Sequence, residues 1–376
     1  MKEFPHLSII AGEDSGDFHG ANLAAALRRQ LPQIRLSGIG GQKMGEQGVE
    51  LIFPSARLAV VGITEVLKRL PDIFSGCRAL RRHLRESRPD LLVLIDFPDF
   101  NLHLVAPYAR KLKIPIVYYI SPQVWAWRQG RVAAINRLVE KILVILPFEK
   151  EFYHRRGVAV EYVGHPLLDE FENFRSLPHR HRSLIALIPG SRSSEVKRLL
   201  PLMLTAARLY SRRQPEARFI IPVAPSLSLD FIRQMIPTSL REKIILLRQP
   251  LSQALVKVSF ALVTSGTATL ETALAEVPMV VVYKVNLFSY WLGKKLISVP
   301  HISLVNLVAE KEIVPELIQN DVLPEQITKQ MRRLMDNHET YDKICRELKE
   351  LKKKLGKAGA SERAAQAILA ILKKHQ

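Results

Sequence analysis

The sequence has few cysteines and no long apolar run. Only Cys77 and Cys345 occur among 376 residues, too far apart in sequence to indicate a metal-ligand pair or a disulfide framework, and this predicts a reducing, cytosolic environment. The longest uncharged stretch, Ile114 to Trp127, is shorter than the roughly 18 apolar residues that span a bilayer, and two prolines interrupt it. The first residues lack a signal-peptide core. We therefore expect a protein that is not integral to a membrane.

The usual nucleotide and metal motifs are also missing. Gly12, Gly16 and Gly20 are spaced by four, and the cluster Gly38 to Gly41 has Lys43 where the dinucleotide fingerprint needs its third glycine. Neither a Walker A lysine motif nor an Asp-x-Asp motif occurs. NAD or ATP binding in the usual modes is therefore not expected. The sequence predicts no cofactor and no metal.

The charge is strongly one-sided, with 55 basic and 36 acidic residues and a net charge of +19. Such an excess favours an anionic partner, which can be a nucleic acid, an acidic membrane surface or a phosphorylated substrate. No RNA-binding run, zinc-finger spacing or basic zipper is present, so we do not expect a nucleic-acid partner.

Short runs of Val, Ile and Leu alternate with longer amphipathic segments, which is typical of parallel sheets with crossover helices. A polar, proline-containing stretch at residues 166–182 divides two such series and is interpreted as a linker. The pattern predicts two doubly wound α/β domains in tandem. The expected strands are Leu7–Ala11, Ile34–Ser37, Leu91–Ile95, Ile116–Ile120 and Lys141–Ile145, then Leu184–Ile188, Phe219–Val223, Lys243–Leu247, Phe260–Val263 and Pro278–Tyr283.

From Pro324 onward the chain is basic and helical in pattern, and Ser361 is a candidate cap of a final amphipathic helix. We expect domains at residues 1–170 and 171–340, followed by C-terminal helices at 341–376. Those helices would pack on the first domain or on a partner subunit, so a homo-oligomer is one possibility.

The loop after the first expected strand reads AGEDSGDFHG and is rich in acids. A tight strand-to-helix turn would explain its glycines, including Gly16, but not the acids Glu13 and Asp17 around Ser15. Carboxylates at a helix start repel phosphate and suit sugar hydroxyls. We interpret the loop as a contact for a sugar or an acceptor.

The loop after Leu91–Ile95 reads DFPDFN, from Asp96 to Asn101, and we expect Asp99 and Asn101 to contact the substrate or acceptor. Ligands of open α/β sheets bind beyond the carboxyl ends of the strands, where Asp96 falls. Glycosyl transfer needs a base that takes the proton of the attacking hydroxyl, and a partly desolvated Asp suits that role. Asp96 is our candidate base, with Asp99 as an orienting or capping acid. The alternative is that either acid only caps the next helix.

Two loops of the second half predict phosphate sites at helix starts. PGSRSSE places Ser191 and Arg192 after a strand, and TSGTATLE places Ser265, Gly266 and Thr267 after another. Glu271 follows one helical turn later, where a carboxylate can accept both ribose hydroxyls. Together these loops indicate a nucleoside diphosphate.

Eight segments, in order and over most of the chain to about residue 320, resemble the lipid-A-disaccharide synthase family. They are AGEDSGD, GIGG, DFPDFN, SPQVWAWR, LPFEKEFY, VGHPLLD, PGSRSSE and TSGTATLE. The resemblance implies a GT-B fold, with two Rossmann-like domains facing each other across a cleft. It also implies inverting transfer of 2,3-diacylglucosamine from UDP-2,3-diacylglucosamine to the 6-hydroxyl of 2,3-diacylglucosamine 1-phosphate, giving the β-1,6 disaccharide and UDP.

The resemblance supports Asp96 as base and Arg192, Ser265 to Thr267, Glu271 and Asn306 as UDP contacts. The segment around Asn306 departs from the family, because Val305 and Glu310 stand where proline and glycine are expected.

Acylated substrates imply peripheral contact with the anionic inner face of the inner membrane. Residues 57–88 combine apolar side chains with eight basic and three acidic residues, which suits such a surface. Ordinary core packing is the alternative for each apolar residue. The candidate membrane patch consists of Val61, Ile63, Val66, Leu67, Lys68, Arg69, Leu70, Ile73 and Phe74.

Two other functions fit parts of the pattern. One is another GT-B enzyme acting on a UDP-sugar, such as a peptidoglycan-type transferase or a UDP-sugar 2-epimerase. The other is a non-catalytic protein that binds lipid or anionic surfaces, although Asp96, Arg192 and Glu271 argue against it.

Overall fold

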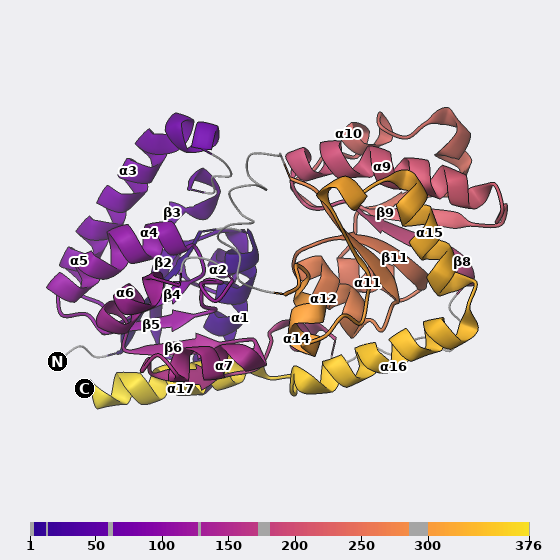
Figure 1. The fold of residues 1–376 in the computed structure, drawn as a ribbon. Helices are drawn as coiled ribbons and strands as arrows, with labels where there is room; N and C mark the ends of the chain where they lie inside the picture. The colour runs from indigo at the N-terminus through magenta and orange to yellow at the C-terminus, as the bar shows by residue number, and fades with distance from the viewer. Residues whose placement is uncertain are drawn as a thin grey trace. The chain divides into compact units, whose positions relative to one another are not determined.

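The computed structural model describes residues 4–12, 14–58, 63–126, 129–171, 181–285 and 300–375, and it leaves out the side chains of residues 14, 63–70, 181 and 182. The chain divides into two compact units (Figure 1). Unit 1 contains Met1–Pro166 and Lys357–Gln376, and unit 2 contains Leu167–Gly356. The chain therefore passes between the units twice.

Unit 1 is built on a seven-stranded parallel sheet of order β3-β2-β1-β4-β5-β6-β7. This order, with a reversal between β1 and β4, is that of a Rossmann-like domain. Its elements are β1 (His6–Ala11), α1 (Asp14–Gln30), β2 (Arg35–Gly40), α2 (Gln42–Glu46), β3 (Glu50–Pro54), η1 (Ser55–Arg57), α3 (Ile63–Ser87), β4 (Leu91–Ile95), α4 (Pro98–Phe100), η2 (Asn101–Val105), α5 (Ala106–Lys111), β5 (Ile116–Tyr119), α6 (Arg131–Leu138), β6 (Lys141–Val144), α7 (Pro147–His154), β7 (Val160–Tyr162) and α17 (Ala360–Lys374).

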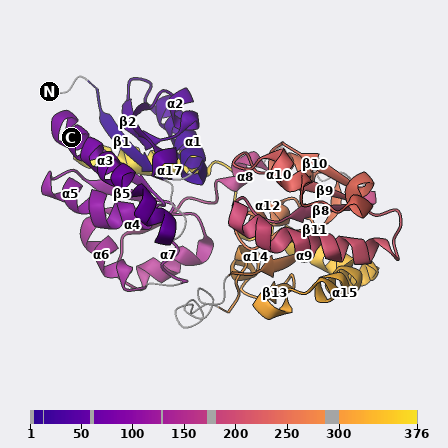
Figure 2. The same cartoon turned by 90° about the horizontal axis from the view of Figure 1, so that it is seen from above.

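Unit 2 repeats the design with a six-stranded parallel sheet of order β10-β9-β8-β11-β12-β13 (Figure 2). Its elements are α8 (Leu167–Glu170), β8 (His181–Ile188), α9 (Ser193–Ser211), β9 (Arg218–Pro222), α10 (Leu229–Arg233), η3 (Thr238–Lys243), β10 (Ile244–Leu247), α11 (Leu251–Leu255), β11 (Val258–Thr264), α12 (Thr267–Leu274), β12 (Met279–Tyr283), α14 (Leu304–Ala309), β13 (Glu316–Ile318), η4 (Gln319–Asp321), α15 (Pro324–Met335) and α16 (His338–Lys354).

The central strands of both sheets are completely buried. Every residue of β4, with the sequence LLVLI, and of β11 is shielded from solvent, because helices cover both faces of each sheet. In unit 1 the register pairs Ala11 with Ile95 and Ile95 with Tyr119, so the carboxyl ends of β1, β4 and β5 lie level. The loops that follow these three strands therefore begin at the same edge of the sheet. The predicted α/β class with two Rossmann-like domains is confirmed.

All ten predicted strands are present, with boundaries within three residues of the prediction. Three further strands, β3, β7 and β13, were not predicted. Each lies at the edge of its sheet and is partly exposed, so it lacks the continuous apolar run of a central strand.

Helix α17 packs against α1 of unit 1, more than 300 positions earlier in the chain (Figures 1 and 2). Glu362 accepts hydrogen bonds from the Arg29 guanidinium and, at 2.9 Å, from Gln30 Nε2. The prediction that Ser361 caps this helix is wrong. The N-cap is Gly359, whose φ of 92° suits glycine, and Ser361 is buried inside the first turn.

Candidate active site

The first turn of α1, which contains Asp17, is tied to the segment that follows β2. The buried Asp17 carboxylate accepts hydrogen bonds from the main-chain N–H groups of Gly41, Lys43 and Met44, at 2.7, 3.1 and 3.1 Å. It therefore caps the start of α2. A Cβ on Gly41 would lie 2.6 Å from Asp17 Oδ2, so this close approach requires glycine. The Asp17 carboxylate, predicted to contact an acceptor, thus links the first turn of α1 to the start of α2 in this structure.

The other residues predicted in this loop have different surroundings. Ser15 is exposed, whereas Gly16 is buried, and a Cβ there would lie 3.3 Å from Ala11 Cβ. Glu13 lies outside the described residues. Ser15, Gly16 and Asp17 all lie in the first turn of α1, and of these three residues only Ser15 is exposed to solvent.

The second loop begins with a strained turn. Asp96 and Phe97 have φ angles of 43° and 52°, in the left-handed region that costs an L-residue roughly 1–2 kcal/mol. Asp tolerates this conformation better than a bulky aromatic residue does. Such strain persists only where the surroundings enforce it, and it concentrates at functional sites. Asp96 lies at the carboxyl end of β4, as the sequence predicted for the candidate base. Its side chain is only partly buried.

The strained turn packs directly on the first loop. The Phe97 ring covers Gly12, where an added Cβ would lie 2.2 Å from the ring. On its other side, Phe97 stacks on Phe100 with ring centroids 5.1 Å apart. Gly12 therefore permits the Phe97 ring to pack closely against it. This contact brings the segment after β1 next to the turn that follows β4.

Two side chains hold the main chain of this turn. Tyr118 Oη donates to the Asp96 carbonyl oxygen at 2.6 Å, and Asn101 Nδ2 donates to the same oxygen at 2.7 Å. Asn101 is completely buried and begins η2, a single π-helical turn. Such turns occur frequently at functional sites. Asn101, predicted as a substrate contact, therefore supports the backbone of Asp96.

Asp99 makes a different contact from Asp96. It forms an ion pair with Arg131 of α6, whose side chain is largely buried while Asp99 itself is exposed. The N-cap of α4 is Phe97, without a side-chain capping bond. Neither acid is therefore the N-cap residue of this helix, and Asp99 anchors α6 to the loop.

Sequence reasoning missed Glu149, a buried acid of α7. Its carboxylate accepts hydrogen bonds from Trp125 Nε1 at 3.0 Å and from the main-chain N–H groups of Ile145 and Leu146 at 3.2 and 2.9 Å. Burial, the largest cause, raises the pKa of Glu149 to about 7, although these three donors oppose the shift. Glu149 thereby holds the loop that follows β5. The capping position of Glu149 after Pro147 was the available sequence signal.

Two buried histidines of unit 1 are uncharged at neutral pH. Burial lowers the pKa of His19 to about 4, and the charge of Lys43 adds to the shift. Burial likewise lowers the pKa of His165 to about 3, with a contribution from His19. Neither imidazole can then serve as a cation for phosphate at pH 7.

In unit 2, the loop between β8 and α9 presents Arg192 at the start of a long helix. Gly190 has a φ of 116°, and a Cβ there would lie 2.4 Å from Glu195 Oε2. Arg192 is exposed and lies 3.3 Å from the Glu195 carboxylate, and the carbonyl of the exposed Ser191 accepts a hydrogen bond from Ser226 at 2.9 Å. The guanidinium and the first N–H groups of α9 are therefore suited to bind an anion.

The loop between β11 and α12 makes a second such helix start. Gly266 has a φ of 152°, and no atom of the described residues outside its immediate chain neighbours would lie within 4 Å of a Cβ at this position. Thr267 is exposed, while Ser265 Oγ donates to the Ile302 carbonyl at 3.0 Å. Burial first, and the charge of Glu170 second, raise the pKa of Glu271 to about 7. This carboxyl group therefore changes charge near neutral pH.

Asn306 is completely buried, and its amide is fully used inside the protein. Nδ2 donates to Val314 O and Glu316 Oε1, both at 2.8 Å, and Oδ1 accepts from the N–H groups of Ile313 and Val314. Glu316 also accepts from Ile302 N at 2.9 Å. Asn306 is thus linked to the segment that Ser265 contacts, and in this structure it supports that loop.

The candidate membrane patch is only partly described. Val61 lies outside the described residues, as do the side chains of Ile63, Val66, Leu67, Lys68, Arg69 and Leu70. Ile73 packs against the core, whereas Phe74 is 70% exposed. Among the described residues, no helix has the length and apolar character needed to cross a bilayer.

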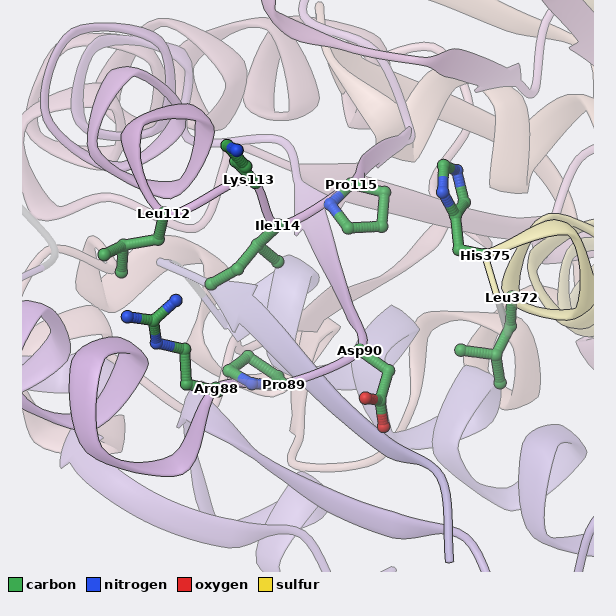
Figure 3. Close-up of a pocket in the computed structure, with 9 residues that line it drawn as sticks. All are labelled: Arg88, Pro89, Asp90, Leu112, Lys113, Ile114, Pro115, Leu372 and His375. Atoms are coloured by element: carbon green, nitrogen blue, oxygen red, sulfur yellow. The ribbon is translucent and has the colours of Figure 1, made fainter. Parts of the chain in front are cut away.

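A shallow cavity of about 240 Å³ lies at the opposite edge of the unit 1 sheet (Figure 3). It is lined by residues that precede β4 and β5, including Asp90 and Pro115. Leu372 of α17 and His375, which directly follows that helix, complete the lining. Because ligands of such sheets bind at the carboxyl ends of the strands, this cavity is not the candidate active site.

Solved structures with the same architecture show the class of fold. The Staphylococcus aureus MnaA–UDP co-structure matches with a TM-score of 0.68 and 13% identity, covering 98% of this chain and 97% of that one. The glycotransferase of kitacinnamycin matches with a TM-score of 0.66 and 15% identity, covering 98% and 99%. The fold is therefore that of the GT-B class, which includes glycosyltransferases and UDP-sugar epimerases.

Sequence comparison identifies the family. The sequence model of the lipid-A-disaccharide synthetase family matches residues 7–371. The lipid-A-disaccharide synthase of Syntrophus aciditrophicus is 44% identical over 97% of both chains, and that of Myxococcus xanthus is 40% identical over 99% of both. The chain belongs to the lipid-A-disaccharide synthetase family and is a glycosyltransferase of lipid A biosynthesis.

Proposed function

We propose that this protein transfers 2,3-diacylglucosamine from UDP-2,3-diacylglucosamine to the 6-hydroxyl of 2,3-diacylglucosamine 1-phosphate. The bond between the anomeric carbon and the UDP oxygen breaks, and a bond from acceptor O6 to that carbon forms with inversion. UDP and a β-1,6-linked disaccharide 1-phosphate are released. Membership of the family supports this reaction.

The observation that carries the residue assignment is the position of Asp96 at the carboxyl end of the buried strand β4. A carboxylate there can take the proton of the acceptor hydroxyl as O6 attacks. The turn is held by Tyr118 and Asn101, so the carboxylate leaves the sheet in a fixed direction. Proton removal thereby raises the nucleophilicity of O6 during attack.

The residues of unit 2 suit the leaving UDP. Arg192 and the N–H groups at the starts of α9 and α12 offer positive charge and donors to a diphosphate. Glu271 would accept hydrogen bonds from the ribose hydroxyls. Asn306 would act through the loop that it supports. These groups can offset the charge that develops on UDP, so the proposed transfer uses no metal.

Both substrates carry acyl chains, and we assign peripheral contact with an anionic membrane surface to the side of unit 1 that carries α3. The exposed Phe74 and the exposed basic residues Arg78, Arg81 and Arg82 support this assignment. Sedimentation with anionic vesicles tests it. Phe74→Ser combined with Arg78→Gln should reduce the bound fraction several-fold, whereas Phe4→Ser, which removes another exposed aromatic, should leave it unchanged. Equal binding by both variants would contradict the assignment.

The reaction is tested by UDP release from the two lipids with EDTA present, and by mass spectrometry of the product. We expect UDP only when both lipids are present, together with the disaccharide. Asp96→Asn should lower kcat by at least about a hundredfold. The control Asp342→Asn, an exposed acid of α16, should retain the wild-type rate. Turnover or epimerisation of a simpler UDP-sugar without disaccharide would contradict the proposed reaction.

A further inference from the structure

A tyrosine hydroxyl reaches the candidate base through the apolar core of unit 1. Tyr118 lies on β5, is completely buried and belongs to the core cluster that contains Leu94 and Phe100. The sheet register pairs Tyr118 with Leu94, two residues before Asp96. Its hydroxyl donates to the Asp96 carbonyl at 2.6 Å. The Tyr118 ring, held in place by the central strand β5, thus carries its hydroxyl to the main chain of the strained turn.

We propose that Tyr118, assisted by Asn101, is a positioning residue for glycosyl transfer, because the two donors hold the main chain of Asp96 in the left-handed turn that aims its carboxylate. The proposal rests on the role of Asp96 as base. Neither side chain has to touch the substrate for this role. Their target is a single carbonyl oxygen, which accepts both hydrogen bonds within 2.7 Å.

The turn has several features that make such support necessary. Asp96 and Phe97 are consecutive non-glycine residues with positive φ, a conformation that L-residues leave readily when nothing opposes it. The main-chain N–H of Asp96 donates to Ile120 O at 3.2 Å, and Ile120 also has a positive φ, of 58°. The residue that follows β5 thus holds the N–H of Asp96, while Tyr118 and Asn101 hold its carbonyl oxygen.

The Tyr118 hydroxyl is suited to donate a hydrogen bond at every pH at which the enzyme works. Burial and the negative charge of Asp96 raise the pKa of Tyr118 well above its ordinary value. The hydroxyl therefore keeps its proton throughout the working pH range. The hydrogen bond is then present whether Asp96 is ionised or protonated.

The principal test is Tyr118→Phe, which removes the hydroxyl and keeps the ring in the core. Misplacement of a catalytic group by about 1 Å costs on the order of a hundredfold. We expect kcat to fall by about ten- to a hundredfold, with KM for either lipid changed by less than about threefold. Asn101→Ala should lower kcat in the same direction. Tyr341→Phe is the control, because Tyr341 also donates to a buried main-chain carbonyl, Ser259 O at 2.7 Å, but in unit 2. It should keep the wild-type kcat.

A double-mutant cycle distinguishes positioning of Asp96 from an independent effect. Asp96→Asn should preserve the turn, because Asn also tolerates the left-handed region. Adding Tyr118→Phe to Asp96→Asn should then change the residual rate by less than about twofold. Multiplicative losses would overturn the proposal. So would a wild-type kcat in Tyr118→Phe.

A structural measurement separates this proposal from the reaction itself. If the wild-type protein makes no disaccharide, the proposed function fails, whatever Tyr118 does. Crystal structures of Tyr118→Phe and Asn101→Ala still report the turn in that case. We expect Asp96 or Phe97 to leave the positive-φ region in at least one of these variants. An unchanged turn in both would overturn the positioning role.

Discussion

The guanidinium of Arg363 donates a hydrogen bond from Nε to the main-chain carbonyl of Val163, at 2.8 Å and across 200 positions of the sequence. The same side chain donates to Ala358 O and Lys357 O, both at 2.7 Å. Val163 and Lys357 lie close, along the chain, to the two points where it passes between the units. One side chain of α17 thus joins the two connecting segments where they meet unit 1.

We predict that Arg363→Gln destabilises unit 1. Three hydrogen bonds from a charged group to main-chain carbonyls are lost or weakened, and the unfolding free energy should fall by about 2–4 kcal/mol. Urea unfolding followed by circular dichroism measures the change. Lys373→Gln, an exposed substitution on the same helix, should change the free energy by less than about 0.5 kcal/mol. Equal stabilities of the two variants would contradict the assigned role.

Gly12→Ala should damage the strained turn without touching Asp96. The new Cβ would lie 2.2 Å from the Phe97 ring, so the ring has to move. We expect a loss of about 1–3 kcal/mol in unfolding free energy and a lower kcat. Gly130→Ala provides the control, because Gly130 has a φ of −57° and open space for a Cβ. That variant should be as stable as the wild type or slightly more so. Unchanged kcat in Gly12→Ala would mean that the Phe97 contact does not influence the base.

The raised pKa of Glu149, about 7, predicts a decline of stability with pH. The folded protein binds this proton more tightly than the unfolded chain, whose carboxyl titrates near its ordinary pKa. The unfolding free energy should therefore fall as the pH rises from about 4.5 to about 7, by on the order of 3 kcal/mol. Glu149→Gln should remove this component, whereas Glu151→Gln, exposed on the same helix, should retain it. Urea titrations across that range decide between them.

Nucleotide binding should depend on the ionisation of Glu271. With its pKa at about 7, a carboxylate that accepts ribose hydroxyls forms as the pH rises, so affinity should increase through neutrality. UDP-GlcNAc is a suitable probe, because its diphosphate diester does not titrate in this range. Glu170→Gln removes the second cause of the shift and should move the midpoint to lower pH. Asp169→Asn on the same helix should leave the midpoint in place. Calorimetry at several pH values measures both.

Arg192→Met should weaken UDP binding by about ten- to a hundredfold, because a charge-assisted contact to the diphosphate is lost. Arg208→Met is the control, because Arg208 is exposed near the other end of α9, and it should leave the affinity for UDP unchanged. Fluorescence or calorimetric titration with UDP gives the two affinities. Equal affinities would place the diphosphate elsewhere.

The sequence was sufficient to predict the central strands and the loops that follow them. Runs such as LLVLI have one reasonable interpretation, a strand covered on both faces, and parallel strands direct their carboxyl ends to one edge. This reasoning correctly predicted that Asp96 follows a buried strand and that Arg192 lies at the start of a helix. Edge strands such as β3 and β13 are short and partly polar, so their pairing depends on a neighbour that the local pattern does not reveal.

The supporting contacts were not predictable in the same way. Tyr118 reads as one more apolar residue of a strand, and its role depends on a carbonyl 22 positions earlier. Arg131 and Glu149 likewise act through partners 32 and 24 positions away. Asp17 was predicted to contact a sugar or an acceptor, and Asn306 to contact UDP. Burial and neighbouring main-chain N–H groups, which only the fold defines, direct both side chains inward.

The position of α17 has a consequence for biosynthesis. Unit 2 is encoded without interruption by residues 167–356, whereas unit 1 needs residues 357–375 to cover α1. Domains generally fold as units while the chain leaves the ribosome. The first strand of unit 1 is translated before any part of unit 2. Because unit 1 also needs α17, it is nevertheless the last of the two units to be completed. A nascent chain stalled before α17 would expose the apolar face of α1 to chaperones, even with unit 2 fully folded.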